Sequence, residues 1–406
     1  MKWSRRVIKY MIEGLFTLSG GVTSLVILLI VVFLFKEGMG LFTNPAVEKG
    51  YALCVNAANP TGSLDARVVK QIFDGEITTW EEVSEGKMTG PIALFRFNEI
   101  FSRYTEEELG EDYALLSPRL QEVVAGTPGI IAFLPEEYLP PGQEVVKRLR
   151  AGNITPGSFF TGGEWQPTVA PAPRFGVLPL ILGTIWVSLF AIVLALVPGL
   201  GVAIYLSELA GARARGWLKP TIELLAGIPS VVYGFFGLVV LVPFIQKLFS
   251  LPVGESALAG SVVLAIMALP TIITIAEDAI RGVPRALREA SLALGATHWQ
   301  TIYRVIIPHA SSGITAAAVL GIGRAVGETM AVLMVTGNAA VMPRSLFEPV
   351  RTIPATIAAE LGEAPAGGAH YQALFLLGCI LFVITMVINL SAEFIASRGQ
   401  GKGVGA

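Results

Sequence analysis

Six long apolar runs constrain the fold of this 406-residue chain more than any other feature. An α-helix needs about 20 mostly apolar residues to cross the hydrocarbon core of a bilayer, and it satisfies its own backbone polar groups there. Only 15% of the residues are charged, against about 25% in soluble proteins. We therefore predict an all-α integral membrane protein with six transmembrane helices. The runs cover residues 15–36, 176–206, 222–246, 256–277, 312–336 and 371–394.

The distribution of basic residues predicts the orientation in the membrane. The first run follows a basic stretch and no small-residue cleavage site follows it, so we interpret it as a retained anchor rather than a signal peptide. Lys and Arg collect in alternate connections, and the positive-inside rule places those connections and both termini in the cytoplasm. The residues concerned are Lys2, Arg5, Arg6 and Lys9; Arg213, Arg215 and Lys219; Arg281, Arg285, Arg288 and Arg304; and Arg398 with Lys402.

The segment between the first two runs, residues 46–170, has a different composition. It contains 18 acidic and 10 basic residues, whereas the rest of the chain contains 13 acidic and 19 basic residues. The stretches "YALCVNA", "PIALFRF" and "GIIAFL" predict strands, and residues 65–74 and 117–125 predict helices. The asymmetry of charge indicates a different compartment. We expect a small α/β unit on the extracytoplasmic side, with a modest core of its own.

These features divide the chain into four predicted regions. The Gly-rich run 152–163, with Pro171 and Pro173, predicts a linker from the α/β unit back to the second apolar run. The regions are the cytoplasmic N-terminus and first membrane anchor (1–45), the extracytoplasmic α/β insert (46–170), a five-helix core (171–398) and a short cytoplasmic tail (399–406).

A polar stretch, residues 284–310, separates the fourth and fifth apolar runs. Pro284 is suited to the start of a helix and Gly295 to a turn, and a second helical segment is predicted to end at Ile307, before Pro308. The orientation places this helix–turn–helix in the cytoplasm. A surface amphipathic helix is the simplest interpretation of such a segment, and its polar sequence alone does not exclude it.

The fifth run, "AAAVLGIGRAVGETMAVLMVTGN", contains Arg324 and Glu328. An ionisable group at membrane depth costs about 2.5–3.5 kcal/mol on insertion scales. Residues four apart share a helix face, and small residues on that face would permit close helix packing. Two interpretations stay open. The pair is a salt bridge that helps insertion, or Arg324 binds a transported anion, since guanidinium groups suit tetrahedral oxyanions.

Several motifs resemble one transporter family. The polar stretch "EASLALGATHWQTIYRVIIPHA" resembles the EAA loop of ABC importer permeases, with Ser291 in place of a second Ala. The stretches "GRAVGETMAVLMVTGN", "ELLAGIPSVVYGFFGL" and "FGVLPLILGTIWVSLFAIVLALVPGLGVAIYLSELA" are similar to the C-type permease subunits of Pst phosphate importers. The resemblance implies a MetI-like permease fold. It assigns phosphate passage to Arg324 and Glu328, and contact with an ATPase to Glu289, Ala290, Ser291, Gly295 and Pro308.

The family resemblance also implies partners. These are a second permease subunit of the A type, a dimer of cytoplasmic ATP-binding subunits, an extracytoplasmic phosphate-binding protein, inorganic phosphate and membrane lipid, with no nucleic acid and no cofactor. The chain's Gly-Lys pairs, Gly86-Lys87 and Gly401-Lys402, lack the spacing of a phosphate-binding loop. ATP hydrolysis is therefore expected in a partner chain. The implied location is the bacterial cytoplasmic (inner) membrane.

The insert resembles part of a periplasmic phosphate-binding protein in "NPTGSLDARVVKQIFDGEITTWEEV" and "GTPGIIAFLPEEYL". In that family a helix N-terminus holds the anion, and the matching positions here are Arg96 and Ser102. Arg103 stands where the family has Gly, and three glutamates follow at 106–108. Three roles stay open: a lobe that docks the binding protein or caps the pore, a weak anion site at Arg96 and Ser102, and a structural relic.

A membrane-anchored phosphate sensor and a permease for another oxyanion are the alternatives to a phosphate permease. A membrane-anchored phosphate sensor would not need an arginine within a membrane helix. A permease for another oxyanion is distinguished from a phosphate permease by the family resemblance alone. The two cysteines, Cys54 and Cys379, form no CxxC motif, and no catalytic or metal site is predicted.

Overall fold

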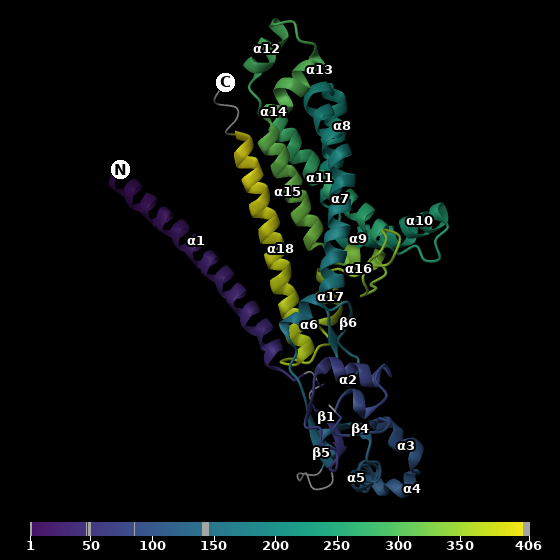
Figure 1. Cartoon of the computed structure of the whole chain (residues 1–406). Coiled ribbons are helices and arrows are strands. Elements are labelled where there is room, and N and C mark those ends of the chain that lie inside the picture. The colour runs from purple at the N-terminus through teal and green to yellow at the C-terminus, as the bar shows by residue number, and fades with distance from the viewer. Residues whose placement is uncertain (1, 46, 48–49, 85, 140–145, 401–406) are drawn as a thin grey trace. The chain divides into compact units, whose positions relative to one another are not determined.

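The computed structural model describes residues 2–45, 47, 50–84, 86–139 and 146–400. The chain divides into two compact units: Met1–Gly176 with Ala364–Leu376, and Val177–Glu363 with Leu377–Ala406. Figure 1 labels the elements of both units. Most of the predicted tail, residues 401–406 with the Gly401-Lys402 pair, lies outside the described residues.

A five-stranded mixed sheet forms the centre of the first unit. The strand order is β2-β5-β1-β4-β3. Strand β1 pairs antiparallel with β4 and β5, whereas β3 runs parallel to β4 and β2 runs parallel to β5. The three strands predicted from the sequence are β1, β3 and β4, so the α/β prediction for this region is confirmed. The strands are β1 (Tyr51–Asn56), β2 (Ser63–Leu64), β3 (Ala93–Arg96), β4 (Ile130–Pro135) and β5 (Val146–Ala151).

Alternate residues of β1 and β4 pack against helices on opposite faces of this sheet. Cys54 and Ala132 face the helices α3, α4 and α5, whereas Val55 and Ile131 face α2 and the loop that carries Trp80. Burial raises the pKa of the Cys54 thiol to about 12, so this cysteine is an unreactive core residue. The helices are α2 (Ala66–Phe73), α3 (Ile100–Arg103), α4 (Glu106–Leu109) and α5 (Leu116–Gly126).

The predicted linker is more ordered than its sequence indicated. Helix α6 (Pro156–Thr161) lies within 152–163, and β6 (Trp165–Gln166) pairs with β7 (Arg174–Phe175). The Thr155 hydroxyl caps α6, and Phe159 is fully buried. The Phe159 ring packs edge-on against Phe42, with 6.0 Å between ring centroids. The predicted linker thus contains a short helix and a strand pair, and buried aromatic side chains hold this stretch in place.

The first membrane helix, α1 (Lys2–Met39), packs against the start of α18 (Ala369–Gln400). Phe33 and Phe375 meet edge to face at 5.6 Å between centroids, and the Asn44 amide donates to the Gln372 side chain at 2.6 Å. A Cβ on Gly38 would lie 2.9 Å from the Leu376 backbone. A glycine is thus required for this approach, which explains why residues 364–376 belong to the first unit.

Helix α11 forms the centre of the second unit. Of its apolar window 61% is buried, and it packs with α7, α9, α10, α15 and α16 in one apolar cluster. The helices are α7 (Leu178–Ile204), α8 (Ala212–Ala226), α9 (Ser230–Phe236), α10 (Val242–Phe249), α11 (Ala257–Arg281), α12 (Arg285–Ala293), α13 (His298–Thr301), α14 (Ile307–His309), α15 (Ser311–Gly327), α16 (Met330–Val335) and α17 (Ile353–Glu360).

Five helical segments of the described chain are long and apolar enough to cross a membrane, or six if one bent pair counts as a span. The mostly helical, six-span prediction is therefore confirmed, with two corrections. The third run is broken at Gly227–Pro229, between α8 and α9, because Pro229 has extended backbone angles. The fifth run is not one helix from 312 to 336. Its first part, α15, bends by 68° from the helical segment before it and ends at Gly327.

Close packing against α11 makes one glycine sensitive to substitution. A Cβ on Gly260 would lie 2.5 Å from Cγ2 of the buried Thr336, so Gly260→Ala is expected to cost about 1–3 kcal/mol of stability through overpacking. Thermal unfolding of the purified chain in detergent measures this. Gly201→Ala is the matched control, since no atom lies within 4 Å of the added Cβ. Equal unfolding temperatures for the two variants would contradict the packing.

Candidate functional site

The polar stretch 284–310 forms the predicted helix–turn–helix. Helix α12 ends before Gly295, which has a φ of +83°, and Thr297 then caps α13 through a capping box with Gln300. A π-helical turn follows at Ile302–Ile306 and continues into α14. The second helical segment runs through Pro308 to His309 rather than ending at Ile307, because a proline is tolerated in the first turn of α14.

One side of this segment is largely exposed. Glu289, Ala290 and Gly295 are exposed and Ser291 is half-buried. Two large apolar side chains that the sequence reasoning did not single out share this exposure: Leu294 is 89% exposed and Trp299 is 62% exposed. Exposed apolar groups beside small residues are typical of a protein contact surface. In the sequence, Leu294 directly precedes Gly295 and Trp299 follows it by four residues.

The other side is attached to the membrane helices. Ile302 and Ile306 are buried among the ends of α7 and α11. The Ser291 and Thr301 hydroxyls lie 2.9 Å apart and hold α12 against α13. Arg288 donates to the Ile280 carbonyl at 2.8 Å. Its guanidinium also lies 2.9 Å from the Glu208 carboxylate in the π-helical turn that ends α7. Movement of α12 would therefore displace the ends of two membrane helices.

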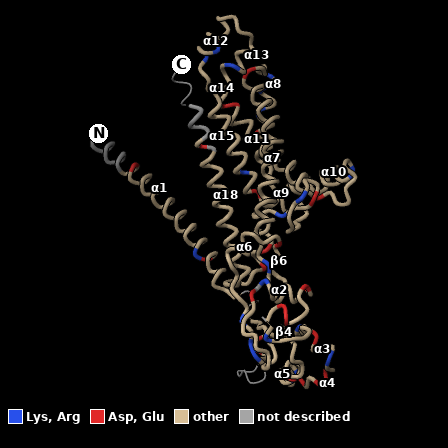
Figure 2. Tube along the Cα trace, viewed as in Figure 1, with Lys and Arg blue, Asp and Glu red and all other residues tan. Residues whose placement is uncertain are grey.

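A buried carboxylate lies nearby in the same unit. Glu277 of α11 is 1% exposed, with Lys219 of α8 at 3.0 Å and Arg281 at 3.3 Å. Two cations compensate the cost of burying one carboxylate. Figure 2 shows basic residues at the end of this unit where α12 and α13 lie. Glu277 was not predicted as a functional residue, although the sequence places it four residues before Arg281 at the end of an apolar run.

The structure separates Arg324 from Glu328. Helix α15 ends at Gly327, and Glu328 is extended, with a ψ of 133°. The Glu328 carboxylate accepts from the Ala331 N–H at 3.4 Å, at the start of α16. The predicted shared helix face is therefore wrong, because the helix stops between the two residues. No ion pair joins them in the described part of the chain, which weighs against a salt bridge that helps insertion.

Arg324 is not paired with a carboxylate among the described residues. It lies in the last turn of α15 and is exposed, with its guanidinium 3.5 Å from the Thr271 hydroxyl. Ala317 and Gly321 are buried on the packed side of α15. The break after Gly327 borders an apolar crevice of about 500 Å³. The crevice is lined by Gly327, Thr329, Pro354, Ile357, Ala358, Leu361, Gly362 and Leu381.

The structure does not assemble the predicted weak anion site of the insert. The Arg96 guanidinium lies 3.5 Å from the Phe73 carbonyl, and the Ser102 hydroxyl donates to the Glu99 carbonyl at 2.7 Å. Ser102 lies inside the four-residue helix α3, not at its start. At the next helix, the Thr105 N–H donates to Glu108 at 2.8 Å. This bond lowers the pKa of Glu108, and the carboxylate occupies the position an anion would need.

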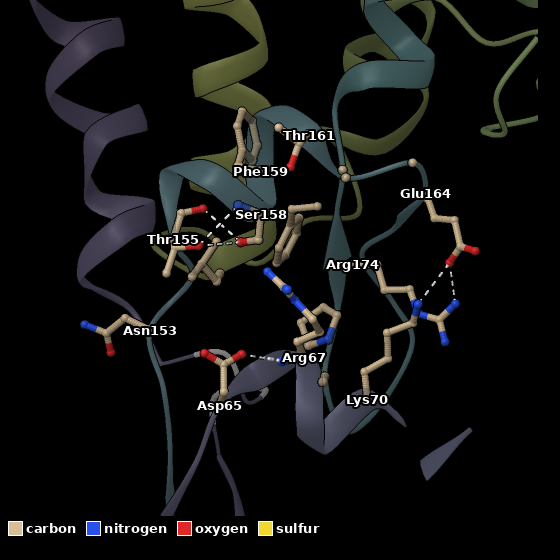
Figure 3. A pocket seen from close by; sticks show the side chains of 17 residues that line it. Asp65, Arg67, Lys70, Asn153, Thr155, Ser158, Phe159, Thr161, Glu164 and Arg174 are labelled. Atoms are coloured by element: carbon tan, nitrogen blue, oxygen red, sulfur yellow. Dashed lines mark hydrogen bonds and ion pairs between the residues drawn. The ribbon is translucent and has the colours of Figure 1, made fainter. Parts of the chain in front are cut away.

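The first unit contains a cavity that was not predicted from the sequence (Figure 3). Its volume is about 510 Å³, and it lies between α2, α6 and the β6–β7 pair. Arg174 pairs with Glu164 and Asp74, and the first of these bonds lowers the pKa of Glu164. Lys70 lies 3.6 Å from Glu164. Because these charges compensate one another, the cavity has no strong preference for an anion.

Comparison with known proteins places the second unit in a family. Residues 199–399 match the family described as binding-protein-dependent transport system inner membrane component. A probable ABC transporter permease, YqgH of Bacillus subtilis, is 41% identical over 63% of this chain and 83% of its own length. The phosphate transport system permease PstC of Mesorhizobium japonicum is 41% identical over 59% of this chain and 78% of its own. A chain of the inward-facing MetNI methionine ABC transporter is 21% identical, with a TM-score of 0.43, over 54% of this chain and 96% of that one.

The apolar helices define a multi-pass membrane protein, and its helix–turn–helix exposes large apolar side chains. The chain belongs to the family of binding-protein-dependent transport system inner membrane components, which are ABC transporter permeases. It is a membrane subunit rather than an enzyme.

Proposed function

We propose that this chain is the permease subunit of an ATP-driven importer that moves inorganic phosphate across the bacterial cytoplasmic membrane. The observation that carries the proposal is Arg324, an exposed guanidinium in the last turn of a membrane helix that has no carboxylate paired with it among the described residues. Guanidinium groups bind tetrahedral oxyanions by two parallel hydrogen bonds. The name of the Mesorhizobium japonicum relative, a phosphate transport permease, supports phosphate as the substrate.

The proposal includes an assembly. A second permease of the A type completes the pathway, and an extracytoplasmic phosphate-binding protein delivers the anion. A dimer of ATP-binding subunits contacts the exposed side of the helix–turn–helix through Glu289, Ala290, Ser291, Gly295 and Pro308, with Leu294 and Trp299 beside them. Both termini lie in the cytoplasm, because the basic connections favour that side.

Uptake by reconstituted vesicles tests the function. The chain is incorporated with its partner permease, ATPase and binding protein, and ATP-dependent uptake of labelled phosphate is measured with sulfate or molybdate as competitors. We expect phosphate uptake that a tenfold excess of either competitor leaves largely unchanged. Uptake of another oxyanion instead would keep the permease and reject phosphate. Binding of phosphate without uptake of any oxyanion would favour the sensor.

A further inference from the structure

One face of the insert carries a cluster of partly exposed aromatic rings, which we call the aromatic face: Phe97, Phe101, Tyr113 and Tyr138. Phe97 stacks on Tyr138 with 5.5 Å between centroids and meets Phe101 edge to face at 5.8 Å. Phe101 meets Tyr113 at 5.7 Å. Phe101 and Tyr113 are 46% and 47% exposed. Linked rings that stay half in solvent are typical of interaction surfaces, where aromatic residues are enriched.

Strained backbone holds part of this face in place. Asp112 and Tyr113 have φ angles of 51° and 57°, so two consecutive non-glycine residues adopt the left-handed region. Such residues are uncommon and concentrate at functional sites, where the surrounding structure maintains them. Here the strain turns the Tyr113 ring toward Phe101. An aromatic side chain fixed before contact loses little entropy when a partner binds.

The surroundings of the aromatic face are strongly acidic. Residues 97–138 contain nine acidic and two basic residues, and Figure 2 shows acidic positions at α4. Both basic residues are already engaged: Arg119 pairs with Glu122 at 2.8 Å, and Arg103 lies over the Phe95 ring. Glu137 raises the pKa of Tyr138, which places negative charge directly beside the rings.

The negative charge around the aromatic face limits which kinds of partner can bind there. A second copy of the chain would bring an equally acidic face, and like charges opposed across an interface are unfavourable. Nucleic acid and anionic lipid headgroups are repelled for the same reason. A soluble protein with lysines and arginines around an apolar patch is complementary to the face in both charge and polarity.

We propose that the aromatic face docks the extracytoplasmic substrate-binding protein through a basic surface of that protein. This inference rests on the proposed import function. It gives the insert a role that does not need an anion site, in agreement with the engaged Arg96 and Ser102 side chains.

Docking is measured with the full-length chain in lipid nanodiscs and fluorescently labelled phosphate-binding protein from the same organism. Phe101→Ala and Tyr113→Ala are each expected to weaken binding by about 30-fold, the loss typical of a central aromatic contact. Phe160→Ala is the matched control, because Phe160 is a phenylalanine of the same insert, 45% exposed, outside the aromatic face. Phe101→Leu, which keeps an apolar group, is expected to lose less.

Salt and charge variants test the basic partner. Wild-type association is expected to slow as ionic strength rises, and Glu111→Gln with Asp112→Asn to reduce that dependence; asparagine tolerates the left-handed backbone at position 112. Binding unaffected by Phe101→Ala and Tyr113→Ala, association independent of salt, or pairing of two copies through this face would each overturn the proposal. Vesicle uptake distinguishes failure of the docking proposal from failure of the import function. Normal wild-type uptake with docking that these variants do not change rejects only the docking proposal. Absence of wild-type uptake rejects the import function.

Discussion

Replacing Arg324 with alanine is expected to lower ATP-dependent phosphate uptake by roughly 10- to 150-fold, the loss that follows removal of one hydrogen-bond partner of a charged group. The guanidinium lies in the last turn of α15 and is exposed, and it donates to the Thr271 hydroxyl at 3.5 Å. An anion that passes this position would lose its only described cationic partner in that helix. Arg324→Lys keeps the charge but not the bidentate geometry, so intermediate uptake is expected.

Two further variants make this prediction specific. Arg344→Ala removes an exposed guanidinium elsewhere in the same unit and is expected to leave uptake unchanged. Glu328→Gln retains a side-chain oxygen that can accept from the Ala331 N–H and is expected to have a small effect, because Glu328 caps α16 rather than pairing with Arg324. If vesicles with Arg324→Ala assemble the complex and take up phosphate at the wild-type rate, Arg324 serves only as an aid in membrane insertion. If Glu328→Gln lowers phosphate uptake as much as Arg324→Ala does, Arg324 and Glu328 act together as a pair.

The sequence predicted those elements whose pattern is local. Membrane helices α7 and α11 follow from length and hydropathy, and strands β1 and β4 follow from apolar runs bounded by turn residues. The break before α9 also has a local cause, because Pro229 cannot continue a helix. In each case the decisive residues lie within the element itself, so no knowledge of its neighbours was needed.

The break at Glu328 depended on tertiary structure. Nothing in "GRAVGETMAV" forbids a helix, and a continuous helix would have placed Arg324 and Glu328 on one face. The chain instead turns after Gly327, and the Glu328 carboxylate caps the next helix. Likewise, the order of the stretch 152–163 comes from buried Phe159, which a reading of glycine content does not reveal. Contacts between distant residues decided both cases.

The contact between the helix–turn–helix and the membrane helices is expected to couple ATP hydrolysis to phosphate transport. We expect Arg288→Ala to lower phosphate uptake per ATP hydrolysed by roughly 30-fold. Breaking a fully buried ion pair on one side costs about 3–5 kcal/mol, and screening of the partly exposed guanidinium reduces this to about 2 kcal/mol here. The Arg288 side chain is 21% exposed and the Glu208 side chain 8%. Loss of the Arg288 guanidinium detaches α12 from the ends of α7 and α11.

The ratio of transport to hydrolysis distinguishes uncoupling from misfolding. Vesicles with Arg288→Ala are expected to hydrolyse ATP while phosphate uptake falls, whereas a misfolded permease would lose both or fail to bind the ATPase. Arg213→Ala, which removes an exposed cation of α8 with no ion pair in the described chain, is the control and should keep the wild-type ratio.

A double-mutant cycle with Glu208→Gln completes the argument. If the pair transmits the motion, adding Glu208→Gln to Arg288→Ala costs little further transport, because the interaction is already absent. It should also recover stability, since the buried carboxylate no longer lacks a partner. Additive losses would mean that Glu208 and Arg288 act separately. Coupling would then pass through the apolar contacts of Ile302 and Ile306 with the ends of α7 and α11, and truncating those side chains would produce the uncoupling instead.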